Sequence, residues 1–286
     1  MVLDRGVNPN SHVSFTASHG DQLSVVPERG GLLTSWICSG RERLYLDQER
    51  FADPSKSVRG GVPVLFPICG NLPNDTLQLP QGTFHLSQHG FARDLPWQLQ
   101  PLAEGEGIRL VLEDSEATRA VFPFPFSLTL DYRLEPSALG IAVTVEHRSH
   151  GEGVMPFSLG LHPYFAVSDL AAVSLEGLPE RCLDHHQMAE ASTASQLAQI
   201  DRGIDLLAAP TQRSVRLRDQ GSSELIEMEL QAPLDLAVVW SEPPRSMVCL
   251  EPWTAPRGAL ISGDRRLELK PGESCRLTCT YRVVQA

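Results

Sequence analysis

The sequence predicts an all-β protein, and three observations support this prediction. Alternating apolar and polar residues recur in short runs along most of the 286-residue chain, as they do in half-buried strands. Gly and Pro separate these runs at intervals typical of an antiparallel sandwich. The one convincing helical segment, 114–121, spans only about two turns, is capped by Asp114 or Ser115 and ends before Pro123. We therefore expect a large β-sandwich with very little helix.

The expected strands begin with a meander over 11–37, which two glycine-containing turns interrupt. Longer runs with clean alternation follow at 107–113, 126–134 and 139–147. The segment 170–212 shows little periodicity, and we interpret it as strands joined by long loops. Strands return from residue 214 to the end of the chain, where alternate residues place one apolar face on the last strand: Cys275, Leu277, Cys279, Tyr281 and Val283.

The composition of the chain indicates its number of domains and limits its possible partners. No repeat of fixed period and no low-complexity linker interrupts it, so we expect a single domain over residues 1–286. A net charge of −11 argues against a nucleic-acid partner, because binding phosphates along a strand requires a concentrated basic face. No run approaches the roughly 20 apolar residues of a membrane span.

The cysteines and the first residues of the sequence bear on the cellular compartment of the protein. Residues 1–15 contain neither the apolar core nor the small-residue cleavage site of a secretion signal. Six cysteines occur without a CxxC motif, and in a chain of this length we interpret them as reduced core thiols. We expect a cytoplasmic protein, and a monomer or weak dimer.

The stretch 58–97 differs from ordinary core segments because glycines and prolines alternate with short apolar runs. Glycine allows tight turns and close backbone approach, and proline fixes the backbone on either side of a run. These features predict an ordered, irregular loop system that presents Arg59, His89 and Arg93. Loops of this kind on a rigid scaffold are where binding and catalytic groups tend to lie.

Three chemically active residues stand where the strand pattern is interrupted: His89, His162 and Glu251. Gly or Pro and aromatic residues border each of them. His changes its charge near neutral pH and Glu is normally ionised, so the set suits acid/base catalysis. The same side chains could also bind Zn²⁺ as a His₂Glu site, but no H-E-x-x-H spacing supports a metal. We expect neither a metal nor a cofactor.

Other residues give weaker signals. Cys182, His185 and His186 could form a ligand cluster, but adjacent histidines on an extended chain point to opposite sides, so we interpret this segment as a solvated loop. The absence of GxSxG, P-loop and GxGxxG motifs argues against common hydrolases and nucleotide-binding proteins. The aromatic residues suited to stacking on sugar rings are Phe91, Trp97, Tyr164, Phe165, Trp240 and Trp253.

Five motifs, taken in order, resemble the aldose 1-epimerase (galactose mutarotase-like) superfamily, in particular its hexose-6-phosphate mutarotase branch. They are VRGGVPVLFPICGNLP, QHGFARDLPW, MPFSLGLHPYF, LEPWT and LELKPGES, and they extend from about Arg59 to Pro271. HGFAR and LHPYF in this order are specific to the superfamily. The resemblance implies an antiparallel β-supersandwich and an enzyme that interconverts the α and β anomers of an aldose.

The resemblance also implies roles for the three active residues. Glu251 matches the family's general base, His162 its general acid and His89 a substrate-binding histidine. Opening the sugar ring requires removal of the proton on the C1 hydroxyl and delivery of a proton to the ring oxygen. A carboxylate and an imidazolium can perform these two transfers, and closing the ring reverses them.

Two further implications concern the substrate. Arg59 and Arg93 match arginines of the phosphosugar branch, so the expected substrate is a hexose or a hexose 6-phosphate. The family's sugar-binding aspartate matches Asp201, with Asp235 as a competing candidate. The alternative function is a carbohydrate-binding protein without turnover on the same fold, because fold alone does not determine function.

Overall fold

The computed structural model describes residues 11–100, 102, 107–151 and 153–285. Strands make up about 48% of the structure and helices about 11%, so the all-β prediction is confirmed. Every pairing between strands in the described residues is antiparallel. Most of the N-terminal segment from which we inferred the lack of a secretion signal lies outside the described residues.

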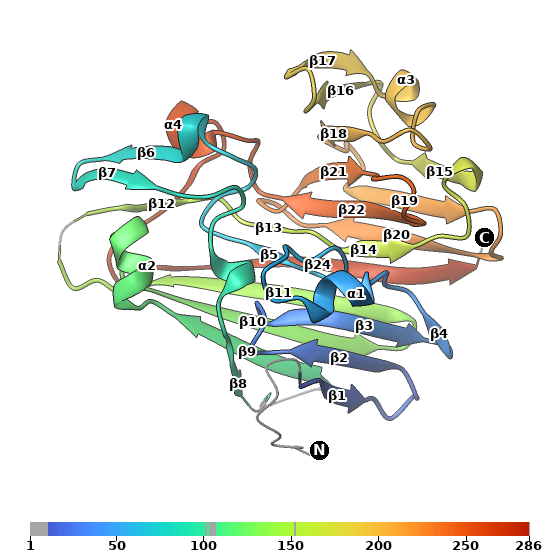
Figure 1. Ribbon diagram of the computed structural model, residues 1–286, viewed down its shortest axis with the longest axis horizontal. Coiled ribbons are helices and arrows are strands. Elements are labelled where there is room, and N and C mark those ends of the chain that lie inside the picture. Colours follow the sequence, from blue (N-terminus) through green and yellow to red (C-terminus); the bar gives the residue numbers. More distant parts are fainter. Residues whose placement is uncertain (1–10, 101, 103–106, 152, 286) are drawn as a thin grey trace.

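Two large sheets dominate the described part of the chain (Figure 1). The first, named here the β24 sheet, has the spatial order β15 Val173–Glu176, β19 Ser214–Asp219, β20 Glu224–Leu230, β24 Ser274–Gln285, β11 Ala138–His147, β10 Phe126–Glu135, β9 Gly107–Glu113 and β8 Gln98–Gln100. The second, named the β22 sheet, has the order β17 Ala189–Ser192, β16 Arg181–Asp184, β18 Asp205–Ala208, β21 Leu236–Trp240, β22 Met247–Trp253, β13 Gly160–Leu161 and β5 Val64–Leu65, with β14 Tyr164–Ala166 also paired to β22.

Smaller sheets extend this framework. The opening meander forms a four-stranded sheet of β1 Val13–Thr16, β2 Gln22–Val26, β3 Leu32–Cys38 and β4 Arg41–Glu42, as the sequence predicts. Two-stranded sheets pair β6 Thr76–Leu79 with β7 Gly82–His85, and β12 Met155–Phe157 with β23 Leu267–Leu269.

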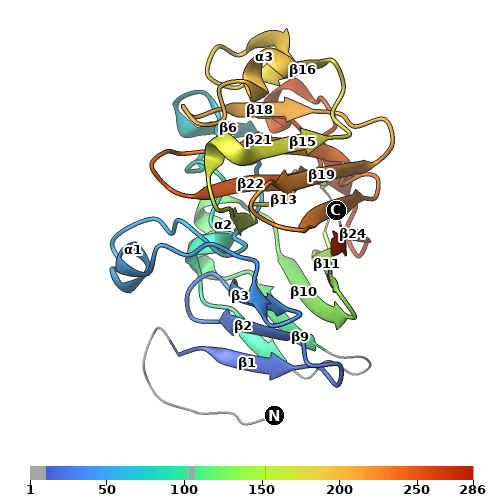
Figure 2. The same ribbon diagram turned by 90° about the vertical axis from the view of Figure 1, so that its right-hand side faces the viewer.

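The core lies between the two large sheets. Figures 1 and 2 both place β22 next to β19 of the β24 sheet. Tyr281 of β24 crosses this interface, because its hydroxyl donates to the carbonyl of Leu250 at 2.8 Å and its ring lies 5.0 Å from that of Phe165. All six cysteines are free, and five of them are buried, in agreement with the interpretation as core thiols.

The helices are short, and side chains cap three of the four in the described residues. Their bounds are α1 Gln48–Ala52, α2 Glu116–Val121, α3 Thr193–Leu197 and α4 Ala259–Ser262, with 3₁₀ turns η1 Pro73–Asp75, η2 Ala92–Asp94 and η3 Leu170–Ala172. The helix α2 confirms the prediction over 114–121, and its N-cap is Ser115. We did not predict α1, α3 or α4, because four or five residues are too few to show a helical period. The side chains of Asp47 and Ser192 cap α1 and α3. No helix in the described residues is long and apolar enough to cross a membrane.

Strand β22 has one side turned toward the main core and one side turned away from it. Its residues are buried throughout, and their side chains alternate between the two sides of the sheet. Val248 and Leu250 join the main core cluster, whereas Met247, Cys249 and Trp253 belong to clusters on the opposite side. Glu251 shares that opposite side. A buried carboxylate on the face turned away from the main core requires a partner or a ligand.

Candidate active site

One face of the β22 sheet forms the floor of a cavity of about 190 Å³. Three adjacent strands supply the floor, with Glu251 and Trp253 from β22, Val238 and Trp240 from β21, and Asp205 from β18. The strand pattern explains this grouping, because alternate residues of each strand point to the same side. The volume is on the scale of a single sugar ring.

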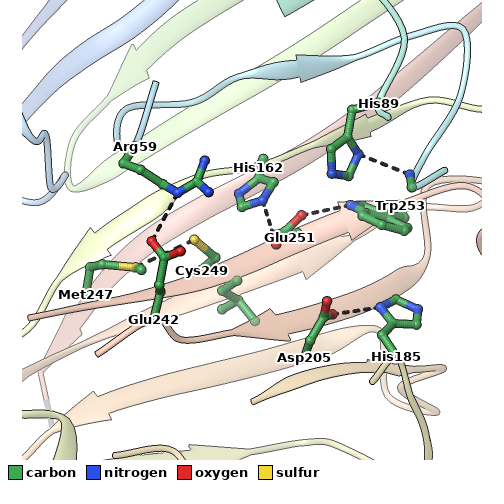
Figure 3. Close-up of polar contacts among 12 residues, drawn as sticks. Arg59, His89, His162, His185, Asp205, Glu242, Met247, Cys249, Glu251 and Trp253 are labelled. Atoms are coloured by element: carbon green, nitrogen blue, oxygen red, sulfur yellow. Dashed lines mark hydrogen bonds and ion pairs between the residues drawn. The ribbon is translucent and has the colours of Figure 1, made fainter. Parts of the chain in front are cut away.

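The loops predicted from the stretch 58–97 close over this floor. They bring Arg59, His89 and Arg93 to the cavity, and His162 enters from the link between β13 and β14. Figure 3 shows Arg59, His162, Glu251 and Trp253 following one another along the site. Five of the six site residues that the sequence predicts therefore lie together; the exception is Asp201.

His162 and Glu251 form the centre of the cavity. The Nε2 atom of His162 lies 3.4 Å from Oε1 of Glu251, and their side chains are 12% and 1% exposed. The second carboxyl oxygen of Glu251 accepts a hydrogen bond of 3.0 Å from the indole of Trp253. The imidazole stacks on Tyr164 with ring centroids 4.8 Å apart. These contacts fix both side chains in an orientation that lets them share a proton.

Burial determines which protonation state of the His162–Glu251 pair is favoured in the cavity. Burial, with a smaller contribution from the charge of Asp205, raises the pKa of the Glu251 carboxyl well above its usual value. Burial, reinforced by the charges of Arg93 and Arg59, lowers the pKa of His162 to about 3. The 3.4 Å separation suits both a charged and a neutral pair. Because low dielectric penalises charge, we assign the neutral form, with one proton on the carboxyl.

His89 is held as a neutral hydrogen-bond donor. The backbone N–H of Gly70 donates to the ring Nδ1 at 3.0 Å, and the backbone N–H of His89 donates to the carbonyl of Gly70 at 2.7 Å. Burial, aided by nearby positive charges, lowers the pKa of His89 well below its usual value. Because Nδ1 accepts, the proton of the neutral ring resides on Nε2. That ring N–H can donate to a hydroxyl group of a ligand.

The aspartate in the cavity is Asp205, which we did not predict. Asp201 is exposed in a turn four residues earlier, and Asp235 pairs with Arg265 away from the cavity. Both candidates belong to loops, whereas Asp205 begins strand β18 and pairs with Trp240 of β21. The motif QIDRGIDLL contains both Asp201 and Asp205, so the segment indicated by the sequence reaches the cavity, but through Asp205 and not through Asp201.

His185 and Arg257 hold Asp205 in place. His185 Nδ1 lies 2.7 Å from one carboxyl oxygen, and Arg257 donates to the other at 2.6 Å. Burial raises the pKa of Asp205, but the hydrogen bond from His185 and the nearby cationic groups outweigh it and lower the pKa below the usual value. His185 is buried and stacked on Trp253, so the interpretation of this segment as a solvated loop is wrong for this residue. Its neighbour His186 is exposed, and both histidines lie in the turn that follows β16.

Two arginines stand at the His162 end of the cavity. Arg59 donates through Nε to Glu242 at 3.0 Å, and its guanidinium lies over the ring of Trp240 at 5.6 Å. Arg93 donates through Nη2 to the carbonyl of Gln88 at 2.9 Å. Because each guanidinium has five N–H donors, these contacts leave donors for an anion.

Aromatic residues divide between the cavity and the core. Tyr164, Trp240 and Trp253 line the cavity. Phe91, Trp97 and Phe165 pack with the main core cluster instead. The expectation of sugar-stacking side chains is therefore compatible with three of the six residues.

A paired carboxyl and imidazole suit proton transfer on a small polar substrate, which is the chemistry of an isomerase acting on sugars. The comparison with known families agrees: the model of the aldose 1-epimerase family matches residues 13–282, and the chain belongs to this family. Its membership confirms the resemblance found in the sequence. It also favours an enzyme over a sugar-binding protein without turnover.

Relatives support the same assignment. A protein of Escherichia coli strain K12 with the name "Putative glucose-6-phosphate 1-epimerase" is 31% identical over 76% of this chain and 69% of its own length. A protein of Cenchrus ciliaris with the same name is 29% identical over 86% of this chain and 77% of its own length. The solved structure of the Slr1438 protein from Synechocystis sp. PCC 6803 covers 100% of both chains with a TM-score of 0.91 and 34% identity. A galactose mutarotase related enzyme from Lactobacillus acidophilus shares the fold, with a TM-score of 0.77 and 22% identity over 96% of this chain and 98% of its own.

Proposed function

We propose that this aldose 1-epimerase acts on a hexose 6-phosphate, with Glu251 as the general base and His162 as the general acid. The observation that carries the proposal is the pairing of these two side chains inside a cavity with arginines at the His162 end. The names of the relatives from Escherichia coli and Cenchrus ciliaris support the same substrate class.

The proposed reaction exchanges two protons. Glu251 removes the proton of the C1 hydroxyl while His162 delivers a proton to the ring oxygen, and the C1–O5 bond breaks to give the open aldehyde. Rotation about C1–C2 exposes the other face of the carbonyl, and the reverse transfers close the ring. Each positioned proton transfer is typically worth about 10²–10⁴ in rate.

The order of groups in the cavity supports a phosphate on C6. In an aldopyranose 6-phosphate the sequence of atoms is phosphate, C6, C5, ring oxygen, C1. Along the site the matching sequence is Arg59, His162, Glu251 (Figure 3). A phosphate at the arginines therefore places the ring oxygen toward His162 and the C1 hydroxyl toward Glu251.

A bound phosphate would also favour the protonated form of His162, the general acid. Arg59 and Arg93 both disfavour a positive charge on His162. An anion bound between them offsets this repulsion and shifts the shared proton from Glu251 to His162, which is the form that the reaction needs. His89 and Asp205 then bind the sugar hydroxyls, as donor and acceptor respectively.

Anomer exchange provides the test of the acid/base pair. Magnetisation-transfer NMR on equilibrated glucose 6-phosphate measures the exchange rate without a coupled enzyme. We expect Glu251→Gln to lower kcat at least 100-fold while the protein remains folded. The same change at the exposed Glu268 is the control and leaves the rate unchanged. Wild-type exchange in Glu251→Gln would overturn the mechanism.

Selectivity between glucose 6-phosphate and glucose tests the arginines. We expect Arg59→Ala and Arg93→Ala each to lower kcat/KM for glucose 6-phosphate at least tenfold and to change that for glucose less than threefold. The exposed Arg216→Ala serves as the control. Equal losses on both sugars would make the two arginines structural and remove the support for a phosphorylated substrate.

The cysteines bear on the location of the protein, and the core bears on its domain organisation. We propose a reducing, cytoplasmic compartment, supported by the six unpaired cysteines. The expectations of a monomer or weak dimer and of no nucleic-acid partner stay predictions, as does the single domain over 1–286, which a core cluster from Ala17 to Tyr281 supports.

A further inference from the structure

Cys249 lies beside the acid/base pair, yet the proposed reaction does not use it. It precedes Glu251 by two residues on β22, so both side chains point to the same side of the sheet (Figure 3). Its side chain is fully buried, and its thiol donates to the sulfur of Met247 at 3.9 Å. A thioether is a weak acceptor, so this contact holds the thiol loosely.

Three different metal-binding side chains meet at this point. His162, Cys249 and Glu251 each offer one ligand atom, and these atoms all lie within 4.8 Å of one another. In a tetrahedral Zn²⁺ site, bond lengths near 2.1 Å to nitrogen or oxygen and 2.3 Å to sulfur place the ligand atoms roughly 3.3–3.7 Å apart. The His162–Glu251 distance of 3.4 Å already falls in this range. Side-chain movements of about 1 Å bring the sulfur within it.

We propose that His162, Cys249 and Glu251 form an inhibitory binding site for Zn²⁺ at the edge of the catalytic cavity, which His162 and Glu251 line. Cys249 replaces His89 of the His₂Glu set considered from the sequence, because His89 is not part of the cluster. A thiolate, an imidazole and a carboxylate are a donor set that Zn²⁺ prefers and Mg²⁺ does not.

Binding of Zn²⁺ at this site balances in protons and in charge. Zn²⁺ binding releases the proton of the Cys249 thiol and the proton that the His162–Glu251 pair shares. The thiolate and the carboxylate then neutralise the two positive charges, while the neutral imidazole supplies a lone pair. A water or a hydroxyl of the substrate takes the fourth position from the cavity side. Arg59 and Arg93 oppose a cation here and Asp205 favours it, so we expect reversible rather than structural binding.

Inhibition follows from the overlap with the acid/base pair, and this part rests on the proposed function. A bound Zn²⁺ occupies both groups that must exchange protons with the sugar. The metal binding itself does not depend on the reaction, so the two can be tested apart.

Cobalt(II) provides a test that is independent of activity. A thiolate bound to Co²⁺ gives a charge-transfer band in the near ultraviolet. We expect a saturable band in wild type and in Cys279→Ala, where the altered cysteine is buried on β24, and no band in Cys249→Ala or Cys249→Ser. The two Cys249 variants distinguish a lost ligand from a disturbed fold, because serine nearly preserves the shape of the side chain. An unchanged band in both Cys249 variants, or no saturable band in wild type, would overturn the site.

Inhibition of anomer exchange is the second test. We expect Zn²⁺ to inhibit wild type, a chelator to restore the rate, and Mg²⁺ at the same concentration to have no effect. Cys249→Ala should retain the metal-free rate and require at least tenfold more Zn²⁺ for half inhibition. Equal sensitivity of wild type and Cys249→Ala contradicts the proposal. If the metal-free enzyme shows no exchange, the proposed function fails, and the cobalt band alone decides the metal site.

Discussion

At the level of single residues, burial sets the chemistry of His162. Burial and the neighbouring arginines lower the pKa of the folded imidazole to about 3, whereas an unfolded chain has the ordinary value of 6.5. Between these values the unfolded chain binds a proton that the folded chain does not bind. The free energy of unfolding therefore decreases as the pH falls through 6.5 toward 3.

This difference gives a measurable stability effect. Between pH 7 and pH 5 the wild type is expected to lose about 2 kcal/mol more unfolding free energy than His162→Gln, which has no titrating imidazole. Urea unfolding at both pH values measures it. The same substitution at His150, which is exposed, is the control and should parallel wild type. If His162→Gln also parallels wild type, the folded imidazole is charged and our assignment of the neutral pair is wrong.

The sequence indicated His89, His162 and Glu251, which meet in the cavity, but not the residues that support them. His89, His162 and Glu251 stand out because glycine, proline and aromatic neighbours interrupt the strand pattern around them. Asp205 does not stand out, because its role depends on the register of β18 against β21. His185 was equally hidden, because it lies in the turn after β16, where strand alternation does not predict which side chain is buried.

At the level of elements, the loop that carries His89 depends on one close backbone contact. Gly90 has φ +70°, and a Cβ atom built on it would lie 2.2 Å from the carbonyl oxygen of Phe66. That oxygen also accepts a hydrogen bond of 3.0 Å from the N–H of Phe91. The HGFAR motif therefore positions His89 through a glycine that no larger residue can replace without moving the loop.

Gly90→Ala tests this dependence. We expect it to destabilise the protein by about 3 kcal/mol or more and to lower kcat at least tenfold, because the loop and His89 must shift. Gly272→Ala is a matched control, since Gly272 has φ +78° but a Cβ atom there would meet nothing within 4 Å, and it should cost only about 1–2 kcal/mol of backbone strain. Similar losses from both substitutions, measured by urea unfolding, would show that the close contact is unimportant.

The length of a segment limits how well a helix or strand can be predicted from the sequence. The long strands and α2 were predictable because their alternation or capping spans enough residues to show a period. The helices α1 and α3 are single turns fixed by one cap each, and the surrounding polar sequence fits a loop equally well. The pairing of distant strands into the β22 sheet leaves no local signal at all.

At the level of the whole molecule, the cavity joins segments far apart in the chain. Its lining extends from Ser57 to Arg257 and includes loops as well as strands of the β22 sheet. The chain as a whole is acidic, with a net charge of −11, so an anionic substrate must be bound by a few local arginines against the overall field. A ligand that contacts so many segments should stabilise the entire cooperative unit.

Thermal unfolding measures this stabilisation without turnover. At a glucose 6-phosphate concentration of about 100 times Kd, binding adds about 2.7 kcal/mol, which raises Tm of a protein of this size by about 5 °C. The double variant Arg59→Ala/Arg93→Ala should shift by less than 2 °C at the same concentration, because the phosphate loses both guanidinium partners. Glucose and inorganic phosphate, tested separately, distinguish the contributions of the two halves of the ligand. An equal shift in wild type and in the double variant would place the phosphate elsewhere and leave the arginines without a role in binding, whatever the activity of the enzyme.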